Sequence, residues 1–226
     1  QSQVRICNNK LSQGYWELKF SSKHLNYESS LMPEIILAST SEYRRSLLSR
    51  LSLKFTCVAP GTVEYALPEE PPTTTAMRLA ESKACSTAER YPEAVVIGAD
   101  QVADLEGQPI NNPVSHDLAV AQLSLQSGKI VRFHSAIAVA QMDPSGELRL
   151  KSCINTTDVH FRDLNESQIQ TYLTAEKPYD CAGSFKVEGL GISLIESVKT
   201  TDPTSLVGLP LIDLCKLLIK FKIDII

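Results

Sequence analysis

The chain has 226 residues, of which 43% are hydrophobic and 21% charged, so it can build an ordinary core and is not intrinsically disordered. Its formal net charge of -4 argues against a general nucleic-acid binder, because such proteins are usually basic enough to neutralise phosphates. Its apolar runs are much shorter than the roughly 20 residues that cross a bilayer. We therefore predict a cytoplasmic protein with no nucleic-acid or membrane partner.

The cysteines and histidines favour neither a disulfide framework nor a zinc site. The six cysteines are scattered through a long chain without a C-x-x-C pair, so we expect reduced thiols. The four histidines do not show the spacing of metal ligands.

Residues 1–32 differ from the rest of the chain. They are rich in Ser, Asn and Gln, and they show no sustained helical or strand period. We expect a non-native or disordered N-terminal extension, with Met32 as the natural start and one domain over residues 33–226. The extension lacks the apolar centre of a signal peptide, but its basic residues and shortage of acids leave a transit peptide open.

From residue 34 onwards, strands and helices alternate. Residues 34–38 predict a buried strand, and the S-x-x-E pattern from Ser39 to Glu42 predicts a capping box for a helix that reaches about Leu51. A second strand over residues 53–59, a loop over 64–75 and a helix over 75–90 follow. Residues 94–98 predict a buried strand that delivers Asp100 and Gln101 at its carboxyl end.

The second half of the chain predicts a long hairpin between helices. Ser115 is the expected N-cap of a helix that ends at Ser127 and Gly128. Residues 129–140 and 148–161 form the hairpin, with its turn at 143–146. A helix over 165–175, a strand over 192–198 and a last helix with Pro210 in its first turn complete the chain. The order predicts an α/β fold in which helices flank a curved mixed β-sheet, with two lobes and a central cleft.

The first cluster of candidate site residues lies at the start of the first predicted helix. Residues 39–45 place hydroxyl groups and the guanidinium groups of Arg44 and Arg45 beside the free N–H groups of a helix N-terminus. Such a site suits phosphate, which arginine binds in bidentate fashion. A plain capped helix with solvated arginines is the alternative. The chain has no G-x-x-x-x-G-K-[ST] loop.

Two acids and a glycine-rich loop form the other candidates. Asp100 stands where open α/β sheets bind ligands, and an acid there can hold Mg²⁺ or Mn²⁺ or orient a water molecule. Glu64 is a second candidate acid, although taken alone it is more typical of an exposed surface acid. Lys83 taken alone is typical of a solvated lysine. Residues 177–191 hold three glycines, two lysines and two acids, in either a ligand-binding or a structural loop.

Five segments together resemble one family. They are LASTSEYRRSLL (37–48), RLAESKA (78–84), IGADQV (97–102), YDCAGSFKVEGLGI (179–192) and DPTSLVGLPLIDL (202–214). From Pro33 to about Leu218, the chain resembles the Maf family of house-cleaning nucleotide pyrophosphatases. The Asp-Gln pair and CAGSFK-x-EG are similar to the branch that acts on 7-methyl-GTP. The dTTP/UTP branch usually carries Asp-Thr.

The resemblance implies metal-dependent hydrolysis of a nucleoside triphosphate to the monophosphate and pyrophosphate. It also implies a Maf/ITPase-like fold, and proteins of the family often form homodimers. The implied metal is Mg²⁺ or Mn²⁺, held by Asp100 and Glu64. Asp100 becomes the proton acceptor that activates water, with Lys83 and Glu64 also in the active site. The implied substrate-binding residues are Ser39, Arg44, Arg45 and Lys186. The residues implied in base selection are Tyr43, Gln101 and Glu188.

Residue chemistry supports a methylated base, since 7-methylguanine carries a positive charge. An acid such as Glu188 and an aromatic ring such as that of Tyr43 suit a cation. One departure is that Asn111-Asn112-Pro113 stands where the family has Gly-Lys-Pro, so a lysine is missing. Val63 also replaces a common Asp. Two alternatives therefore stay open. One is a nucleotide-binding or regulatory protein, linked to septum formation, that no longer hydrolyses nucleotides. The other is a dTTP/UTP pyrophosphatase.

Overall fold

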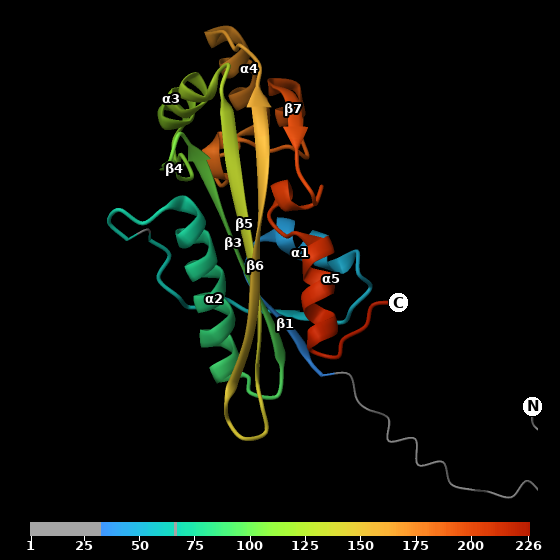
Figure 1. Ribbon diagram of the computed structural model, residues 1–226. Helices are drawn as coiled ribbons and strands as arrows, with labels where there is room; N and C mark the ends of the chain where they lie inside the picture. The colour runs from blue at the N-terminus through green and yellow to red at the C-terminus, as the bar shows by residue number, and fades with distance from the viewer. Residues whose placement is uncertain (1–32, 66) are drawn as a thin grey trace, which may run out of the picture. The chain divides into compact units, whose positions relative to one another are not determined.

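The computed structural model describes residues 33–65 and 67–226 (Figure 1). The predictions for residues 1–32 lie outside the described residues, and the division into an extension and one domain stays a prediction. Within the described residues, no helix combines the length and the apolar character needed to cross a membrane. The five cysteines in this part of the chain are free thiols.

One mixed sheet forms the centre of the fold. Its order is β2-β1-β3-β5-β6-β7, and β4 pairs with β3 outside this path. β1 runs parallel to β2 and β3, whereas the other pairs are antiparallel. The strands are β1 (Ile35–Ala38), β2 (Thr56–Cys57), β3 (Val95–Leu105), β4 (Gln108–Ile110), β5 (Ile130–Met142), β6 (Leu148–Phe161) and β7 (Ile195–Lys199).

Helices flank this sheet at both of its ends. Figure 1 shows α3 and α4 near one end, while α2 lies on the opposite side of the sheet from α1 and α5 towards the other end. This arrangement confirms the predicted α/β class. The helices are α1 (Glu42–Ser49), α2 (Pro72–Arg90), α3 (His116–Gln126), α4 (Glu166–Glu176) and α5 (Leu211–Lys220), with 3₁₀ turns at Ala182–Ser184, Leu190–Leu194 and Ser205–Val207.

The buried side chains form three clusters. The long strands β3 and β5 contribute residues to all three of them. One cluster packs α1 and α5 against one face, and it includes Leu47, Ile97 and Leu214. A second packs the alanines of α2 against the other face. The third joins α3, α4 and the sheet around Phe133 and Phe161.

Several predicted elements are confirmed. Ser115 is the N-cap of α3, and its side chain accepts a hydrogen bond from the Leu118 amide. β6 has the predicted bounds, and the turn before it closes with a 2.9 Å bond from the Gly146 amide to the Asp143 carbonyl oxygen.

Other predictions at element ends were wrong. The predicted capping box is absent from α1, because Ser41 rather than Ser39 is the N-cap. The strand predicted over residues 53–59 contains only Thr56–Cys57, which is exposed. α2 begins three residues early at Pro72, since proline is well suited to a helix start. The strand predicted over 192–198 begins only at Ile195, after a 3₁₀ turn. Pro210 is the N-cap of α5 rather than part of its first turn.

Candidate active site

The most important correction concerns Asp100, which lies in the middle of β3 and not at its end. β3 runs on to Leu105 because it pairs with β5 from Val96 to Asp104. On its other edge, the β1 ladder ends at Gly98 and the β4 ladder begins only at Ala103. Asp100 and Gln101 lie in the interval between these ladders. They therefore lie just beyond the carboxyl end of β1, where the sheet edge is open.

A cavity of about 1060 Å³ opens beside this interval. It brings together residues from α1, α2, β3 and the loops after β4, α4 and β7. The sequence-predicted site residues that line it are Ser39, Tyr43, Arg44, Glu64, Lys83, Asp100, Gln101 and Glu188.

Lys83 links two of the candidate acids. Its Nζ donates to Asp100 Oδ1 at 2.8 Å and to Glu64 Oε2 at 2.7 Å. The Lys83 and Asp100 side chains are buried, whereas that of Glu64 is 51% exposed. Lys83 is thus not the solvated lysine that its sequence context alone would suggest.

Small residues bring Lys83 to Asp100. The face of α2 that packs on the sheet carries fully buried alanines, including Ala80 and Ala84. Gly98 of β3 lies so close to them that a Cβ atom there would be 2.3 Å from the Ala80 oxygen and 2.6 Å from the Ala84 nitrogen. Because a helix and a strand approach closely at this point, the side chain of Lys83 reaches the strand two residues further on.

The electrostatics of Asp100 reflect burial opposed by cations. Burial raises the pKa of the Asp100 carboxyl, while the nearby charges of Lys83 and Arg44 act in the opposite direction. Burial likewise lowers the pKa of Arg44, against the carboxylates of Asp100 and Glu64. A carboxyl whose pKa is raised is a better proton acceptor than an exposed aspartate.

Arg44 and Ser39 lie together at the start of α1. Arg44 Nε donates to the Gly208 carbonyl oxygen at 3.0 Å, and Arg44 Nη1 donates to Ser39 Oγ at 3.5 Å. Ser39 Oγ also accepts from the Ser41 amide at 3.2 Å. The guanidinium is therefore fixed through Nε, which leaves the Nη groups beside a helix N-terminus, where anions bind well.

Gln101 points to the other face of the sheet from Asp100, as alternation along a strand requires. Its Nε2 donates to Ser135 Oγ at 2.8 Å and to the carbonyl oxygens of Ser205 and Leu206, both at 3.1 Å. Its amide orientation is thus set by the neighbouring strand β5 and by the loop after β7.

The acidic corner of the cavity consists of the lining residues Tyr43, Asp180 and Glu188. Asp180 and Cys181 act on the Tyr43 phenol. The pKa of Tyr43 is raised to about 12 by burial and by Cys181 and Asp180, so the phenol stays neutral. Lys186 Nζ lies 5.7 Å from the centroid of the Tyr43 ring. This corner therefore combines the Tyr43 ring with the carboxylates of Asp180 and Glu188, and such a combination suits a cationic ligand.

Two predicted substrate-binding residues are not brought into the cavity. Arg45 is exposed, lies outside the cavity lining and pairs with Glu42 at 3.4 Å. Lys186 also lies outside the lining, and its Nζ forms a 2.9 Å ion pair with Glu176. That bond raises the pKa of Lys186. Neither Arg45 nor Lys186 therefore lines the cavity.

The structure adds residues that were not among the predicted site residues. Asp180 and Asn111 line the cavity, as do Leu206, Val207 and Gly208. Asn112, at the position of the missing family lysine, donates from Nδ2 to the Asp180 carbonyl oxygen at 3.0 Å. The segment DPTSLVGLPL was a clear sequence signal, but contacts made by backbone carbonyl oxygens cannot be read from side-chain types.

Asp100 and Glu64 are the candidate metal ligands. Among residues 33–65 and 67–226, no three His, Cys, Asp or Glu side chains are grouped to hold a metal ion. Asp100 and Glu64 each use one carboxylate oxygen for Lys83, and no described residue donates to Asp100 Oδ2 or Glu64 Oε1. Mg²⁺ often takes only one or two protein carboxylates and completes its shell with water and substrate phosphates. The pair fits a metal of that kind.

Comparisons with known proteins agree with the motif pattern. A family described as Maf-like protein matches residues 34–221. The chain is 50% identical over 187 residues to a protein of Xanthomonas axonopodis named 7-methyl-GTP pyrophosphatase, covering 83% of this chain and 96% of the relative. It is also 50% identical over 184 residues to a Polaromonas protein of the same name, covering 81% and 83%.

Solved structures give a more distant likeness. The Staphylococcus aureus Ham1 protein is 15% identical, with a TM-score of 0.40 over 57% of this chain and 72% of that one. The family match spans all five motif segments and every residue of the cavity lining. The chain therefore belongs to the family of Maf-like proteins.

Proposed function

We propose that this chain is a nucleoside triphosphate pyrophosphatase whose substrate is 7-methyl-GTP, which it hydrolyses to 7-methyl-GMP and pyrophosphate. The reaction class is supported by relatives at 50% identity that are named 7-methyl-GTP pyrophosphatase. The single observation that carries the proposal is the composition of one cavity. It holds a buried acid beside two cations, together with an aromatic ring among acids.

The reacting centre is assigned to Asp100. Phosphoryl transfer needs an oriented nucleophile and neutralisation of charge more than it needs covalent help. Asp100 accepts the proton of the attacking water at Oδ2, while Lys83 holds Oδ1. Glu64 restrains Lys83 from its other side.

The triphosphate is assigned to the start of α1. Arg44 donates through its Nη groups, because Nε is already bound to Gly208. Ser39 Oγ and the N-terminal amides of α1 add neutral donors. Arg45 and Lys186 are given no direct phosphate contact, since both lie outside the cavity lining.

The methylated base is assigned to the acidic corner. Glu188 and Asp180 attract its positive charge, and the Tyr43 ring gives it a surface for stacking. The ammonium of Lys186 near that ring does not oppose this attraction strongly, because Glu176 neutralises it.

A divalent cation, Mg²⁺ or Mn²⁺, belongs to this proposal and would be held by Asp100 and Glu64 together with substrate phosphates. It would supply further neutralisation of phosphate charge. Action in the cytoplasm and a homodimer are likewise predictions.

A substrate panel tests the function. The chain is incubated with 7-methyl-GTP, GTP, dTTP and UTP, with Mg²⁺ or with a chelator, and pyrophosphate release is measured. Preference for 7-methyl-GTP is expected, with loss of turnover in the chelator. Preference for dTTP or UTP would overturn the base assignment. Binding without turnover would favour the regulatory alternative, to which the neutral Asn112 gives some support.

A further inference from the structure

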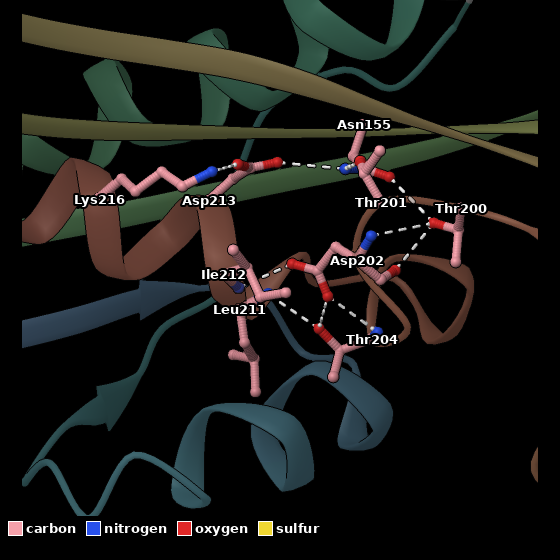
Figure 2. A network of polar contacts seen from close by, with 9 residues as sticks. All are labelled: Asn155, Thr200, Thr201, Asp202, Thr204, Leu211, Ile212, Asp213 and Lys216. Atoms are coloured by element: carbon pink, nitrogen blue, oxygen red, sulfur yellow. Dashed lines mark hydrogen bonds and ion pairs between the residues drawn. The ribbon is translucent and has the colours of Figure 1, made fainter.

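The loop that follows β7 is held at both of its ends by one buried carboxylate. Asp202 has no exposed surface. Its Oδ1 accepts from the Thr204 amide at 2.9 Å and from Thr204 Oγ1 at 2.6 Å, and its Oδ2 accepts from the Ile212 amide at 2.7 Å (Figure 2). Thr204 Oγ1 in turn accepts from the Leu211 amide at 2.8 Å. Asp202 thereby ties the start of the loop to the start of α5.

This arrangement replaces a local helix cap. The N-cap of α5 is Pro210, which makes no side-chain capping bond. The free amides of Leu211 and Ile212 are satisfied instead by Thr204 and Asp202 across the loop. A carboxylate is favoured there because it lies at the positive end of the helix dipole.

The loop between these ends presents three backbone carbonyl oxygens to two residues of the proposed site. Those of Ser205 and Leu206 accept from Gln101 Nε2, and that of Gly208 accepts from Arg44 Nε. Because the acceptors are backbone atoms, the course of the loop decides their positions, whatever side chains the loop carries.

Gly208 shows how closely the loop approaches Arg44. Its φ is +113°, and a Cβ atom there would lie 3.7 Å from Arg44 Nε. A shift of the loop backbone would therefore be transmitted directly to the guanidinium.

We propose that Asp202 is a positioning residue of the active site, which sets the orientation of Arg44 and Gln101 through the loop over residues 202–212. The proposal rests on the proposed function, which assigns the triphosphate to Arg44, and on the role in base selection that the resemblance implies for Gln101. Asp202→Asn places an amide among three donors and so loses at least one of the bonds that hold the loop.

The test is a double-mutant cycle in kcat/KM for 7-methyl-GTP. Asp202→Asn alone is expected to lower kcat/KM by about tenfold or more, mainly by raising KM, and to change the ratio between 7-methyl-GTP and GTP. In an Arg44→Ala background, the same substitution should cost less, because one of the two side chains through which Asp202 acts is gone and only Gln101 remains. Equal losses in both backgrounds would overturn the proposal.

A matched control separates positioning from general stability. Asp213→Asn alters the same polar network, where Asp213 bonds to Asn155 at 3.1 Å and to Lys216 at 2.8 Å, but it does not touch the loop. It should lower the urea midpoint without changing KM. If Asp202→Asn does not fold, Thr204→Val serves in the cycle, since it removes one bond to Asp202 and one to Leu211.

Failure of the proposed function gives a different result. If the wild-type chain prefers another triphosphate, the cycle is measured with that substrate, and non-additivity decides the role of Asp202 as before. If no triphosphate is hydrolysed, the Kd of 7-methyl-GTP replaces kcat/KM in the same cycle. Additive effects on Kd would then overturn the role of Asp202.

Discussion

Lys83 and Asp100 form a buried ion pair with 2.8 Å between Nζ and Oδ1. Glu64, in the loop before α2, forms a second ion pair with the same ammonium group. A buried ion pair of this kind contributes little net stability, because desolvation of both charges offsets their attraction. Its value here is geometric, since it orients one carboxylate oxygen and leaves the other beside the cavity.

Replacement of Asp100 should separate catalysis from stability. Asp100→Asn keeps the side-chain size but removes the proposed proton acceptor, so kcat should fall by about 10²–10⁴-fold. Asp104→Asn is a matched control, because Asp104 is a buried acid on the same strand that bonds to His134 and Gly107 outside the cavity lining. Steady-state pyrophosphate release checks both variants. Near-normal turnover of Asp100→Asn would remove this residue from the mechanism.

The Glu188 carboxylate should discriminate between charged and neutral bases. Glu188→Gln is expected to reduce kcat/KM for 7-methyl-GTP more than for GTP, by about 1–2 kcal/mol, the difference between a charge-assisted and a neutral hydrogen bond. The paired measurement on both nucleotides is its own control. Equal losses on the two substrates would assign Glu188 to the structure of the loop.

The close contact between Gly98 and α2 should be intolerant of a single methyl group. Gly98→Ala places Cβ against the Ala80 oxygen and the Ala84 nitrogen, so α2 must move away from β3. We expect a loss of about 1–3 kcal/mol in the free energy of unfolding, measured in urea, together with reduced turnover because Lys83 shifts from Asp100. The two nearest atoms belong to the backbone, so Ala84→Gly should not restore stability. Rescue by that second substitution would contradict the explanation.

The placement of Arg44 at a helix N-terminus followed from the strand and helix pattern, because that motif falls on an element end. Asp100 was predicted at the carboxyl end of its strand, but it lies in the middle of β3. The length of β3 did not follow, because it depends on pairing with β5, a strand that comes some thirty residues later. The sequence therefore predicted an end to the strand where only the β1 ladder ends.

Side-chain partners were the least predictable feature. Lys83, Arg45 and Lys186 are all cations near motif residues, yet Lys83 is buried against Asp100, Arg45 is exposed and Lys186 is bound to Glu176. Long-range packing decides between these outcomes, and the local sequence does not predict that packing. The same reason explains the N-cap of α1, where Ser39 and Ser41 are equally good cap residues.

The Arg78–Glu70 pair should give the loop before α2 a distinct pH dependence. Arg78 donates from Nε and Nη2 to the two oxygens of Glu70, both at 2.7 Å, and this bonding lowers the pKa of Glu70 to about 2. A carboxyl whose folded-state pKa is depressed stabilises the protein above its unfolded pKa, near 4.5, and loses that contribution as the pH falls towards 2.

The measurement compares wild type with Glu70→Gln by thermal denaturation over a series of pH values. The wild-type advantage should be constant from neutral pH down to about 5 and then shrink as the pH falls further. Arg78 also donates to the Tyr65 carbonyl oxygen, so the variant should loosen the segment that carries Glu64 and raise KM at neutral pH. A wild-type advantage that does not change with pH would show that Glu70 gains nothing from its charge.

The neutral Asn112 should limit turnover. Asn112→Lys introduces the cation that the family resemblance implies at this position, and the residue lines the same cavity as Asp100 and Arg44. An exposed cation of this kind contributes about 1 kcal/mol, so kcat/KM should rise roughly fivefold, with a smaller gain at high salt because the charge is screened. Asn112→Gln is the neutral control, since either substitution alters the bond from Asn112 Nδ2 to the Asp180 carbonyl oxygen. Only the lysine variant should be faster, and kcat and KM measured separately show whether binding or chemistry improves.

An unchanged or lower rate in Asn112→Lys would mean that the acidic corner requires a neutral residue here, because a lysine beside Asp180 and Glu188 would compete with the cationic base.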